Sequence, residues 1–382
     1  MLRTGAAVLV TLAAATGAPD AGGPAPGGLL LVANKGDHTL GIIDPAAGKM
    51  VATVTQSGMT GHEVAAAPDG MTAYVPIYGD SGVGRSGSDG RTMDVIDIGA
   101  RQRVTTVDFG APLRPHEALF GPDGRLYVTA ETANAVKVID PRTNAVVDSL
   151  PTDQPESHML VLSADGKTAY TSNVGAGTVS VIDVAARKVT AVVTVAKRAQ
   201  RIALSTDGRV VFTADQDAPR LAVIDTQTNR LVRGVGLPAV AYGMAPTPDG
   251  RFLLMALPGA SQVGVLDLSS MEVVKTLDVP KSPQEVLVRP DGRMAYVSCD
   301  ASGQVAEVDL DEMKVGRLIP AGPMPDGLAW AAQPQVAEKR PEKQPCRRGD
   351  ISGPARQGPA QVPVRQWIQE THRDGVRTAR TL

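Results

Sequence analysis

An apolar pair closed by aspartate recurs along this chain, and its spacing constrains the fold more than any other feature. The gaps between successive aspartates are 53, 43, 43, 42, 42 and 42 residues, at Asp44, Asp97, Asp140, Asp183, Asp225, Asp267 and Asp309. Asp-Gly pairs keep the same period, with gaps of 54, 42, 42, 42 and 42 residues, at Asp69, Asp123, Asp165, Asp207, Asp249 and Asp291. Two markers that share one period and one insertion indicate repeated copies of one structural unit.

Each repeat contains four short runs with the β-branched content and alternation of strands. In one unit these runs are residues 160–162, 168–172, 179–182 and 189–195. An Asp-Gly turn separates the first two runs, and the aspartate of the apolar marker begins the turn into the fourth. Four antiparallel strands in a repeat of this length predict the blade of a β-propeller, and the repeated aspartates are predicted to be turn residues.

The two ends of the repeat region predict how the ring closes. The first unit begins at Leu29 with a second strand and lacks an innermost one, whereas the last apolar run, 327–331, is in phase with innermost strands. We therefore predict an all-β, seven-bladed propeller over residues 29–332 with four-stranded blades. The C-terminal strand completes the N-terminal blade, which also protects the sheet edges.

The segments outside the repeats predict an exported protein. Arg3 and the short apolar stretch after it suggest a signal peptide over residues 1–21, followed by a Gly/Pro/Ala linker over 22–28. Residues 333–382 carry ten Lys/Arg and five Asp/Glu with many prolines, which predicts a basic disordered tail. No other segment is long and apolar enough to be transmembrane, and Cys299 and Cys346 permit a disulfide without requiring one.

The charge of the chain argues against nucleic-acid binding. The formal net charge is -2 and the tail is basic, so the repeat region is mildly acidic. Such a body lacks the positive surface that the nucleic-acid backbone requires. The expected location is the periplasm or the extracellular space, and the expected state is a monomer.

Four tetrads in the second runs carry a resemblance to a known family. They are Tyr74-Val75-Pro76-Ile77, Tyr127-Val128-Thr129-Ala130, Tyr170-Thr171-Ser172-Asn173 and Tyr296-Val297-Ser298-Cys299. Together with the Asp-Gly and Val-Ile-Asp markers they resemble the YVTN-type β-propeller repeat of exported proteins. The resemblance implies a propeller from Leu29 to about Ala332, and related propellers include lactonases, quinoprotein subunits and a copper reductase.

One repeat position gathers most of the histidines. Seven residues before each Asp-Gly aspartate, where the innermost strand starts, the residue is polar or has a polar tip: His62, His116, His158, Gln200, Tyr242 and Gln284, with Asp326 completing the ring. The next position carries Glu63, Glu117 and Glu285. Innermost strands line the central channel, so these residues predict a polar funnel on one face, which we call the histidine face. Other acids expected in loops of this face, Glu131, Asp215, Asp217 and Asp300, look like ordinary solvated residues.

The funnel predicts a ligand site. Neutral imidazoles from His62, His116 and His158 suit zinc or copper, with an open coordination position for water or substrate. Alternatively, protonated histidines with Arg85 or Arg91 could bind a carboxylate or phosphate. Both arginines belong to a glycine-rich insertion, residues 76–91, which we expect to be an exposed loop beside the channel. Inheritance of one polar dipeptide by duplicated repeats explains the same pattern without any ligand.

Three functions follow from this pattern. The leading hypothesis is a non-catalytic exported propeller that binds a small ligand or an envelope protein at the histidine face, through the ring residues, Glu63, Glu117 and Arg85. The first alternative is a metal- or histidine-dependent hydrolase, similar to a lactonase, in the same funnel. The second alternative is a protein-interaction platform of the cell envelope, which would show exposed apolar patches instead.

Overall fold

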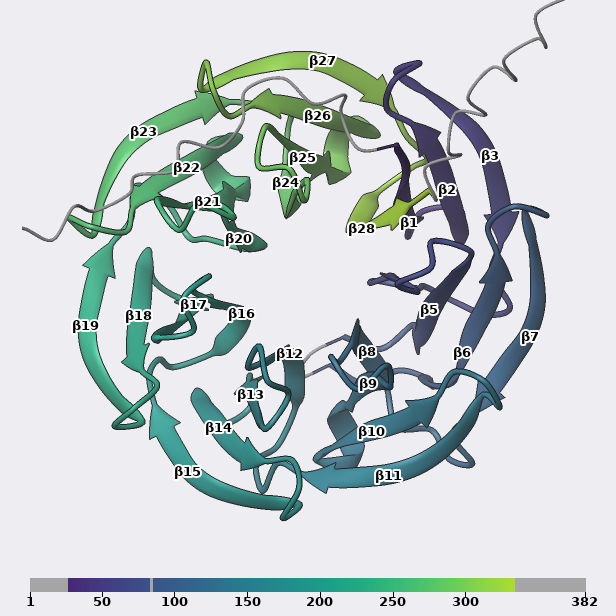
Figure 1. Cartoon of the computed structure of the whole chain (residues 1–382), viewed down its shortest axis with the longest axis horizontal. Helices are drawn as coiled ribbons and strands as arrows, with labels where there is room; N and C mark the ends of the chain where they lie inside the picture. Colours follow the sequence, from purple (N-terminus) through teal and green to yellow (C-terminus); the bar gives the residue numbers. More distant parts are fainter. Residues whose placement is uncertain (1–26, 83–84, 334–382) are drawn as a thin grey trace, which may run out of the picture. The chain divides into compact units, whose positions relative to one another are not determined.

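The computed structural model describes residues 27–82 and 85–333, and these form seven four-stranded antiparallel sheets around a central channel (Figure 1). From the channel outward, blade 1 is β28 (Pro325–Ala332), β1 (Gly28–Asn34), β2 (Thr39–Asp44) and β3 (Lys49–Thr55), and blade 2 is β4 (Ala65–Ala66), β5 (Thr72–Gly79), β6 (Asp89–Asp97) and β7 (Gln102–Asp108). Blade 3 is β8 (Pro115–Phe120), β9 (Leu126–Ala130), β10 (Ala135–Asp140) and β11 (Ala145–Pro151), and blade 4 is β12 (Ser157–Leu162), β13 (Thr168–Asn173), β14 (Thr178–Asp183) and β15 (Lys188–Thr194).

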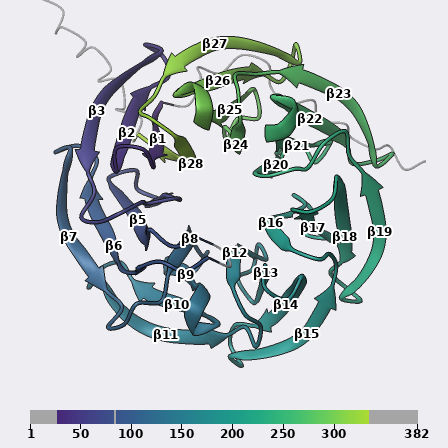
Figure 2. The same cartoon turned by 180° about the vertical axis from the view of Figure 1, so that it is seen from behind.

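The remaining blades repeat this order, as the view from behind also shows (Figure 2). Blade 5 is β16 (Ala199–Leu204), β17 (Val210–Asp215), β18 (Arg220–Asp225) and β19 (Arg230–Gly236), and blade 6 is β20 (Met244–Pro246), β21 (Phe252–Leu257), β22 (Gln262–Asp267) and β23 (Glu272–Asp278). Blade 7 is β24 (Pro283–Val288), β25 (Met294–Cys299), β26 (Gln304–Asp309) and β27 (Lys314–Pro320). Three single-turn 3₁₀ helices, η1 (Glu131–Ala133), η2 (Pro258–Ala260) and η3 (Asp300–Ser302), follow second strands. The predicted fold class is confirmed.

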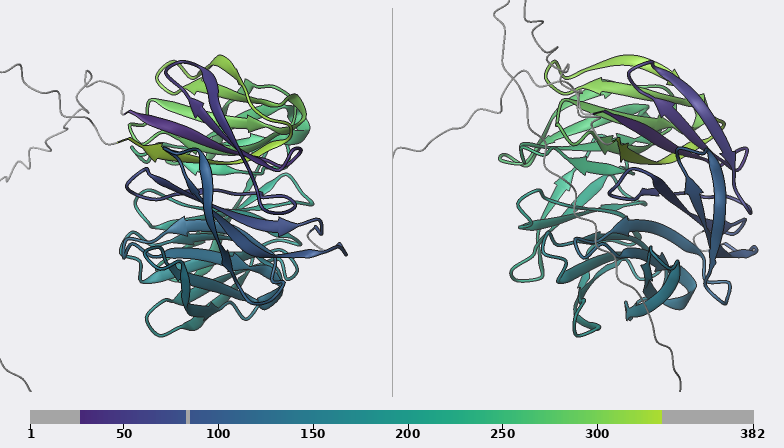
Figure 3. Two further views of the ribbon diagram at one scale, coloured as in Figure 1. Left: turned by 90° about the vertical axis from the view of Figure 1, so that its right-hand side faces the viewer. Right: turned by 45° about the vertical axis from the view of Figure 1, so that its right-hand side comes forward.

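The C-terminal strand closes the ring as the repeat phase predicts. β28 pairs antiparallel with β1, from Gly28 opposite Ala332 to Asn34 opposite Pro325. In the side views the purple β1 and the yellow-green β28 lie together in one blade (Figure 3). The two strands come from opposite ends of the described chain, so the innermost edge of blade 1 is paired rather than open.

The repeated aspartates cap turns, as predicted. In the Asp-Gly turns a carboxylate oxygen accepts the backbone N–H two residues on, for example from Lys167 to Asp165 at 3.1 Å, and the glycines have φ near +70°. In the other marker, the Asp44 carboxylate accepts the N–H of Ala47 at 3.0 Å, and the other six repeats bond similarly. This side-chain bonding is the usual reason for aspartate in turns.

The apolar core is divided among the blade interfaces. Seven clusters of buried hydrophobic residues lie one between each pair of neighbouring blades. Tyr127 of β9, for example, packs with Leu160 of β12 and Ile182 of β14. Hydrophobic burial therefore holds neighbouring blades together, while the channel is left to polar side chains.

The insertion in blade 2 is shorter as a loop than predicted. β5 continues to Gly79 and β6 starts at Asp89, so both ends of the expected loop are strand instead. The connection is tied by the Ser81 hydroxyl, which donates to the Asp89 carboxylate at 2.6 Å. The extra residues therefore lengthen a hairpin at the histidine face.

Several predictions concern residues outside the described ranges. These are the signal peptide, most of the linker, the basic tail and Cys346. Cys299 is described as a buried free thiol, and burial raises its pKa to about 12. Within residues 27–82 and 85–333, no helix has the length and apolar character needed to cross a bilayer.

Candidate functional site

A β-bulge at the start of the innermost strand shapes the channel wall. In blade 3, Pro115 pairs with Ala130 and Ala118 with Val128, so three steps on one strand match two on the other. The same one-residue shift occurs in blades 1, 5 and 7. Blade 4 also has a one-residue shift, where two steps on β12 match one step on β13. A bulge breaks the alternation of side chains, so consecutive residues such as His116 and Glu117 both reach the channel.

Hydroxyl groups of the second strands hold these bulges in place. The N–H of Glu117 donates to the Thr129 hydroxyl at 2.9 Å, and that hydroxyl donates to the carbonyl of His158 in the next blade at 2.8 Å. Ser298 accepts the N–H of Glu285 at 3.0 Å in the same way. The third residue of the Tyr-Val-Thr tetrad therefore links the bulge to the neighbouring blade.

The first ring of predicted site residues surrounds a pocket of about 300 Å³, which we call the funnel pocket. Every residue of the first predicted ring lines it, as does Arg85; the full lining is Lys35, His62, Tyr78, Gly82, Arg85, His116, His158, Arg198, Gln200, Arg201, Gln216, Tyr242, Gln284 and Asp326. Glu63 and Glu117 lie one position deeper and do not line the pocket. Arg91 forms a bidentate ion pair with Asp108 at the surface instead.

The rings of the three histidines lie against one another at tilted angles. The ring centroids of His116 and His158 are 3.7 Å apart and those of His62 and His116 are 5.3 Å apart, with Tyr78 4.6 Å from His62. Burial lowers the pKa of His62 to about 3, although Asp326 opposes the shift, and burial with the neighbouring imidazoles lowers the pKa of His116 well below its usual value. These two rings are therefore neutral at physiological pH.

The zinc or copper prediction gains no support from this geometry. The rings of His116 and His158 lie partly face to face, with an interplanar angle of 34°, whereas metal ligation needs ring nitrogens that point to a common centre. Within residues 27–82 and 85–333, no group of three or more His, Cys, Asp or Glu side chains is placed to hold a metal ion. Glu63 is bound to a different partner.

That partner is Arg201, which the sequence analysis overlooked. Its guanidinium is buried in the channel and donates to Glu63 and Glu285, each at 2.8 Å, and lies 3.6 Å from Asp326. Arg201 directly follows Gln200 of the first ring, so it occupies the same repeat position as the three glutamates. The repeat phase alone could have identified it.

The glycines in this second ring make room for neighbouring carboxylates. A Cβ on Gly243 would come within 2.6 Å of the Glu285 side chain, and a Cβ on Gly327 would collide with Glu63. Each of these glycines lies one blade before the glutamate that it accommodates. In this second ring, formed by the residue after each member of the first ring, three glutamates, Arg201 and Met159 carry side chains and the other two positions are glycine.

The deep glutamates resist ionisation. Burial raises the pKa of Glu117 to about 8, with a further contribution from Glu285, and burial raises the pKa of Glu285 to about 7 against the opposing charge of Arg201. The pKa of Glu63 is also raised, mainly by burial. Asp326 differs, because Lys35 and Arg201 outweigh burial and hold its pKa below the usual value.

A third ring lies at the ends of the second strands. The residues four positions after each Tyr127-type residue are Lys35, Tyr78, Glu131, Val174, Gln216, Pro258 and Asp300. Lys35 binds Asp326 at 3.0 Å and Asp300 at 3.2 Å. Five of the seven residues are polar, which is the signal that could have revealed this ring.

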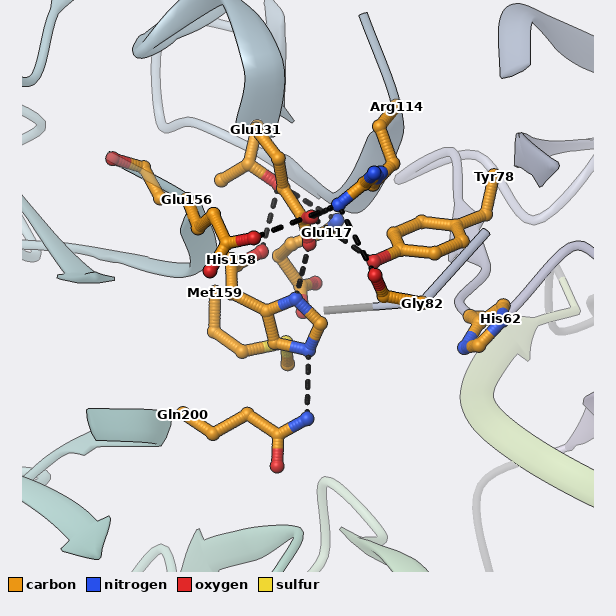
Figure 4. Close-up of polar contacts among 12 residues, drawn as sticks. His62, Tyr78, Gly82, Arg114, Glu117, Glu131, Glu156, His158, Met159 and Gln200 are labelled. Atoms are coloured by element: carbon orange, nitrogen blue, oxygen red, sulfur yellow. Dashed lines mark hydrogen bonds and ion pairs between the residues drawn. The ribbon is translucent and has the colours of Figure 1, made fainter. Parts of the chain in front are cut away.

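Glu131 corrects one prediction, because it is fully buried rather than a solvated loop acid. It accepts hydrogen bonds from the Tyr78 hydroxyl at 3.0 Å and from Arg114 Nη1 at 3.4 Å, and it also contacts His158 Nδ1 (Figure 4). The Gln200 amide nitrogen lies 3.1 Å from His158 Nε2. These contacts favour the tautomer in which Nδ1 donates to Glu131 and Nε2 accepts from Gln200.

Arg114 ties the insertion to this cluster. It binds Asp89 through Nε at 2.9 Å and Nη2 at 2.8 Å, and its Nη1 donates to the carbonyl of Gly82 at 3.4 Å. The insertion is therefore held beside the funnel pocket, where Arg85 forms part of the rim. Arg198 lies on the rim from the loop before β16, with its nearest carboxylate, Asp217, 3.8 Å away.

Comparisons with known proteins agree with the propeller fold. The family model of the Cytochrome D1 heme domain matches residues 121–247, a third of the chain. Similar solved structures include Kuenenia stuttgartiensis hydrazine synthase (20% identity, TM-score 0.65, 78% of this chain and 99% of that chain) and the Pseudomonas aeruginosa periplasmic gluconolactonase PpgL (20%, 0.65, 80% and 99%). The dihydro-heme d1 dehydrogenase NirN is also similar (17%, 0.59, 78% and 74%).

At these identities the likeness shows the fold alone. No curated protein sequence matches the chain. The seven-bladed propeller expected from the YVTN-type resemblance is present, while membership of that repeat family stays a sequence resemblance.

Proposed function

We propose that this chain is an exported β-propeller that binds a small polar ligand bearing a carboxylate or phosphate group in the funnel pocket. The observation that carries the proposal is a set of buried polar atoms that have no hydrogen-bond partner among the described residues. They are His116 Nδ1, Gln200 Oε1, Arg201 Nε and Asp326 Oδ1, all on residues that line the pocket. Buried polar atoms rarely lack partners, and each costs about 1–3 kcal/mol, so the walls of this pocket keep polar groups at an energetic cost that packing alone does not explain.

The preference of the funnel pocket for an anionic ligand comes from two arginines on its rim, Arg85 and Arg198. Lys35 and Arg201 are paired with carboxylates, and the imidazoles of His62 and His116 are neutral. The Arg85 guanidinium has no ion-pair or hydrogen-bond partner within the described ranges. Arg198 donates to the side-chain oxygen of Gln216, and its nearest carboxylate, on Asp217, is 3.8 Å away. Neither rim guanidinium is held in a close ion pair, and guanidinium matches carboxylate and phosphate geometry.

Binding of simple anions tests this proposal. Acetate and phosphate are titrated calorimetrically into the parent chain, into the Arg85→Ala/Arg198→Ala variant and into Arg209→Ala, which removes an 85% exposed arginine elsewhere. We expect binding that weakens with salt in the parent and in Arg209→Ala, and at least tenfold weaker binding in the double variant. The proposal is contradicted if neither acetate nor phosphate binds the parent chain. It is also contradicted if the double variant binds the anion with the same affinity as the parent.

A hydrolase similar to a lactonase is the second candidate, favoured by the contact between Glu131 and His158. A carboxylate that holds Nδ1–H leaves Nε2 as a base, once Gln200 turns aside for water. Nε2 would take a proton from water as the oxygen bonds to the lactone carbonyl carbon. The ring C–O bond then breaks, and its oxygen recovers the proton to give a hydroxy acid. The carboxylate of this hydroxy acid could then bind the arginines on the rim of the funnel pocket.

Lactone hydrolysis tests this candidate. Glucono-lactone is chosen because the similar PpgL is named a gluconolactonase, and acid release is followed at constant pH. A positioned general base contributes roughly 10²–10⁴-fold, so Glu131→Gln and His158→Asn should lose at least about 100-fold while the exposed Glu272→Gln does not. A parent rate equal to the uncatalysed rate would remove this candidate without affecting anion binding.

The other candidates have less support. Haem, suggested by the partial family match, is a wide planar macrocycle, and a pocket of about 300 Å³ walled by charged, amide and imidazole groups does not fit it. A protein platform needs an apolar patch, yet on the histidine face only Met59 and Met324 are exposed large hydrophobics among the described residues. Export is supported by the periplasmic location in the name of PpgL.

A further inference from the structure

A second hollow opens on the histidine face beside the funnel pocket. It has a volume of about 440 Å³ and runs between blades 1 and 2, and we call it the methionine groove. Its walls include Met59, Thr60, Asp80 and Met324. Lys35 and His62 line both the groove and the funnel pocket, so the two spaces are adjacent.

Exposed hydrophobic residues distinguish this groove from the rest of the surface. Most exposed large hydrophobics of the described chain lie on the fourth strands of blades, where the repeat places them: Val104, Val146, Val147, Val192, Leu231, Val232, Val274 and Leu318. Met71 lies in an Asp-Gly turn on the opposite face. The remaining two, Met59 at 44% and Met324 at 46% exposure, both line the groove. Their exposure is therefore not a product of the repeat.

Backbone hydrogen bonds hold both methionines in position. The N–H of Gly79 donates to the carbonyl of Met59 at 3.0 Å, and the N–H of Lys35 donates to the carbonyl of Met324 at 3.0 Å. Each methionine segment is thus tied to the end of a second strand that also carries a funnel residue. Methionine side chains adapt to varied apolar partners, which suits a binding wall.

The entrance to the groove carries little free charge. His62 is neutral because burial lowers its pKa to about 3, and Lys35 is paired with Asp300 and Asp326. An apolar chain that leaves the funnel here would pass no unpaired charge at these two residues. Farther along the wall, the Asp80 carboxylate accepts the backbone N–H of Ser88. The polar head of the same molecule would remain between the rim guanidiniums.

We propose that the methionine groove binds an unbranched hydrocarbon arm of the funnel ligand, so that the ligand is an amphipathic carboxylate. This inference rests on the proposed function, because the arm extends a head group held in the funnel pocket. A fully buried methylene strengthens binding by about fourfold, and the groove is open on one side. We therefore expect the affinity to rise about two- to fourfold for each added methylene until the arm leaves the groove.

A chain-length series tests the proposal. Acetate, butyrate, hexanoate and octanoate are titrated into the full chain, and the ratio of octanoate to acetate affinity is the readout. The variant Met59→Ser/Met324→Ser removes the apolar walls, and Met71→Ser, at a 58% exposed methionine of the opposite face, is the matched control. The ratio should be high in the parent and in Met71→Ser, and close to one in the double variant.

The other outcomes separate the two proposals. If all four carboxylates bind with one affinity, the arm proposal is wrong and the funnel proposal stands. If the chain-length gain survives unchanged in Met59→Ser/Met324→Ser, the arm lies elsewhere and the groove assignment is wrong. If no carboxylate binds at any length, both proposals fail together.

Discussion

Neutralising Glu117 should change how the stability of the propeller depends on pH. Burial raises the pKa of this carboxyl to about 8 in the folded protein, from a usual 4.5. The folded state therefore favours the protonated form. The stabilisation is complete below about pH 4.5 and is lost as the pH rises through 8.

The size of the effect follows from the two pKa values. Each tenfold change in proton affinity corresponds to about 1.4 kcal/mol. Between pH 5 and pH 9 the parent should therefore lose about 4 kcal/mol of unfolding free energy through Glu117 alone. Glu285, with a pKa of about 7, acts in the same direction. Glu117→Gln keeps the shape and removes the titration.

Urea denaturation followed by circular dichroism at pH 5, 7 and 9 measures this difference. The Glu117→Gln profile should be flatter than that of the parent, and Glu117→Gln/Glu285→Gln flatter still. The exposed Glu272 of β23 provides the control Glu272→Gln, whose profile should follow the parent. If Glu117→Gln and the parent lose the same stability between pH 5 and pH 9, the carboxyl is not held neutral and the reasoning fails.

Three further changes test other parts of the channel. Arg201→Met leaves Glu63, Glu285 and Asp326 without their shared cation, so unfolding at pH 7 should require about 3–5 kcal/mol less, measured by urea denaturation. Thr129→Val removes the hydroxyl that joins Glu117 to the next blade and should cost about 1–3 kcal/mol in the same assay; no loss would show that the bulge holds without it. Gly250→Ala should lower the free energy of unfolding by about 1–2 kcal/mol, because Gly250 has a φ of +71° in open space. Gly236→Ala is the control, because Gly236 also lies in open space but has no positive φ. Equal thermal midpoints for the two variants would contradict this explanation.

The fold was predictable because it depends on turn residues and strand patterns that occur in every repeat. Turn aspartates such as Asp44 and Asp165 need only local backbone partners, so their period survives in the sequence. The phase of 327–331 was enough to predict closure by β28. The blade 2 hairpin was less predictable, since β5 and β6 extend beyond the repeat length through pairing of Ile77 with Thr92.

The site was predictable as a position and not as a set of interactions. Repeat phase brought His62, His116 and His158 to one pocket, yet it could not show that their rings contact one another. This contact depends on the bulge and on side-chain rotations set by neighbours such as Tyr78.

Two decisive residues differ from their repeat equivalents. Arg201 stands where other blades have glutamate, methionine or glycine. Glu131 stands where the others have lysine, tyrosine, valine, glutamine, proline or aspartate. Their roles depend on partners from other blades, such as Glu285 for Arg201 and Tyr78 for Glu131. The repeat period therefore predicts the ring but not the single blade whose residue differs.

The pairing of β1 with β28 also sets when folding can finish. About 290 residues separate these strands, so blade 1 stays incomplete until almost the whole repeat region is available to fold. Until then β1 has an unpaired inner edge, and such edges favour association between chains. The pairing of β28 is therefore the step that ends the chain's exposure to misassembly.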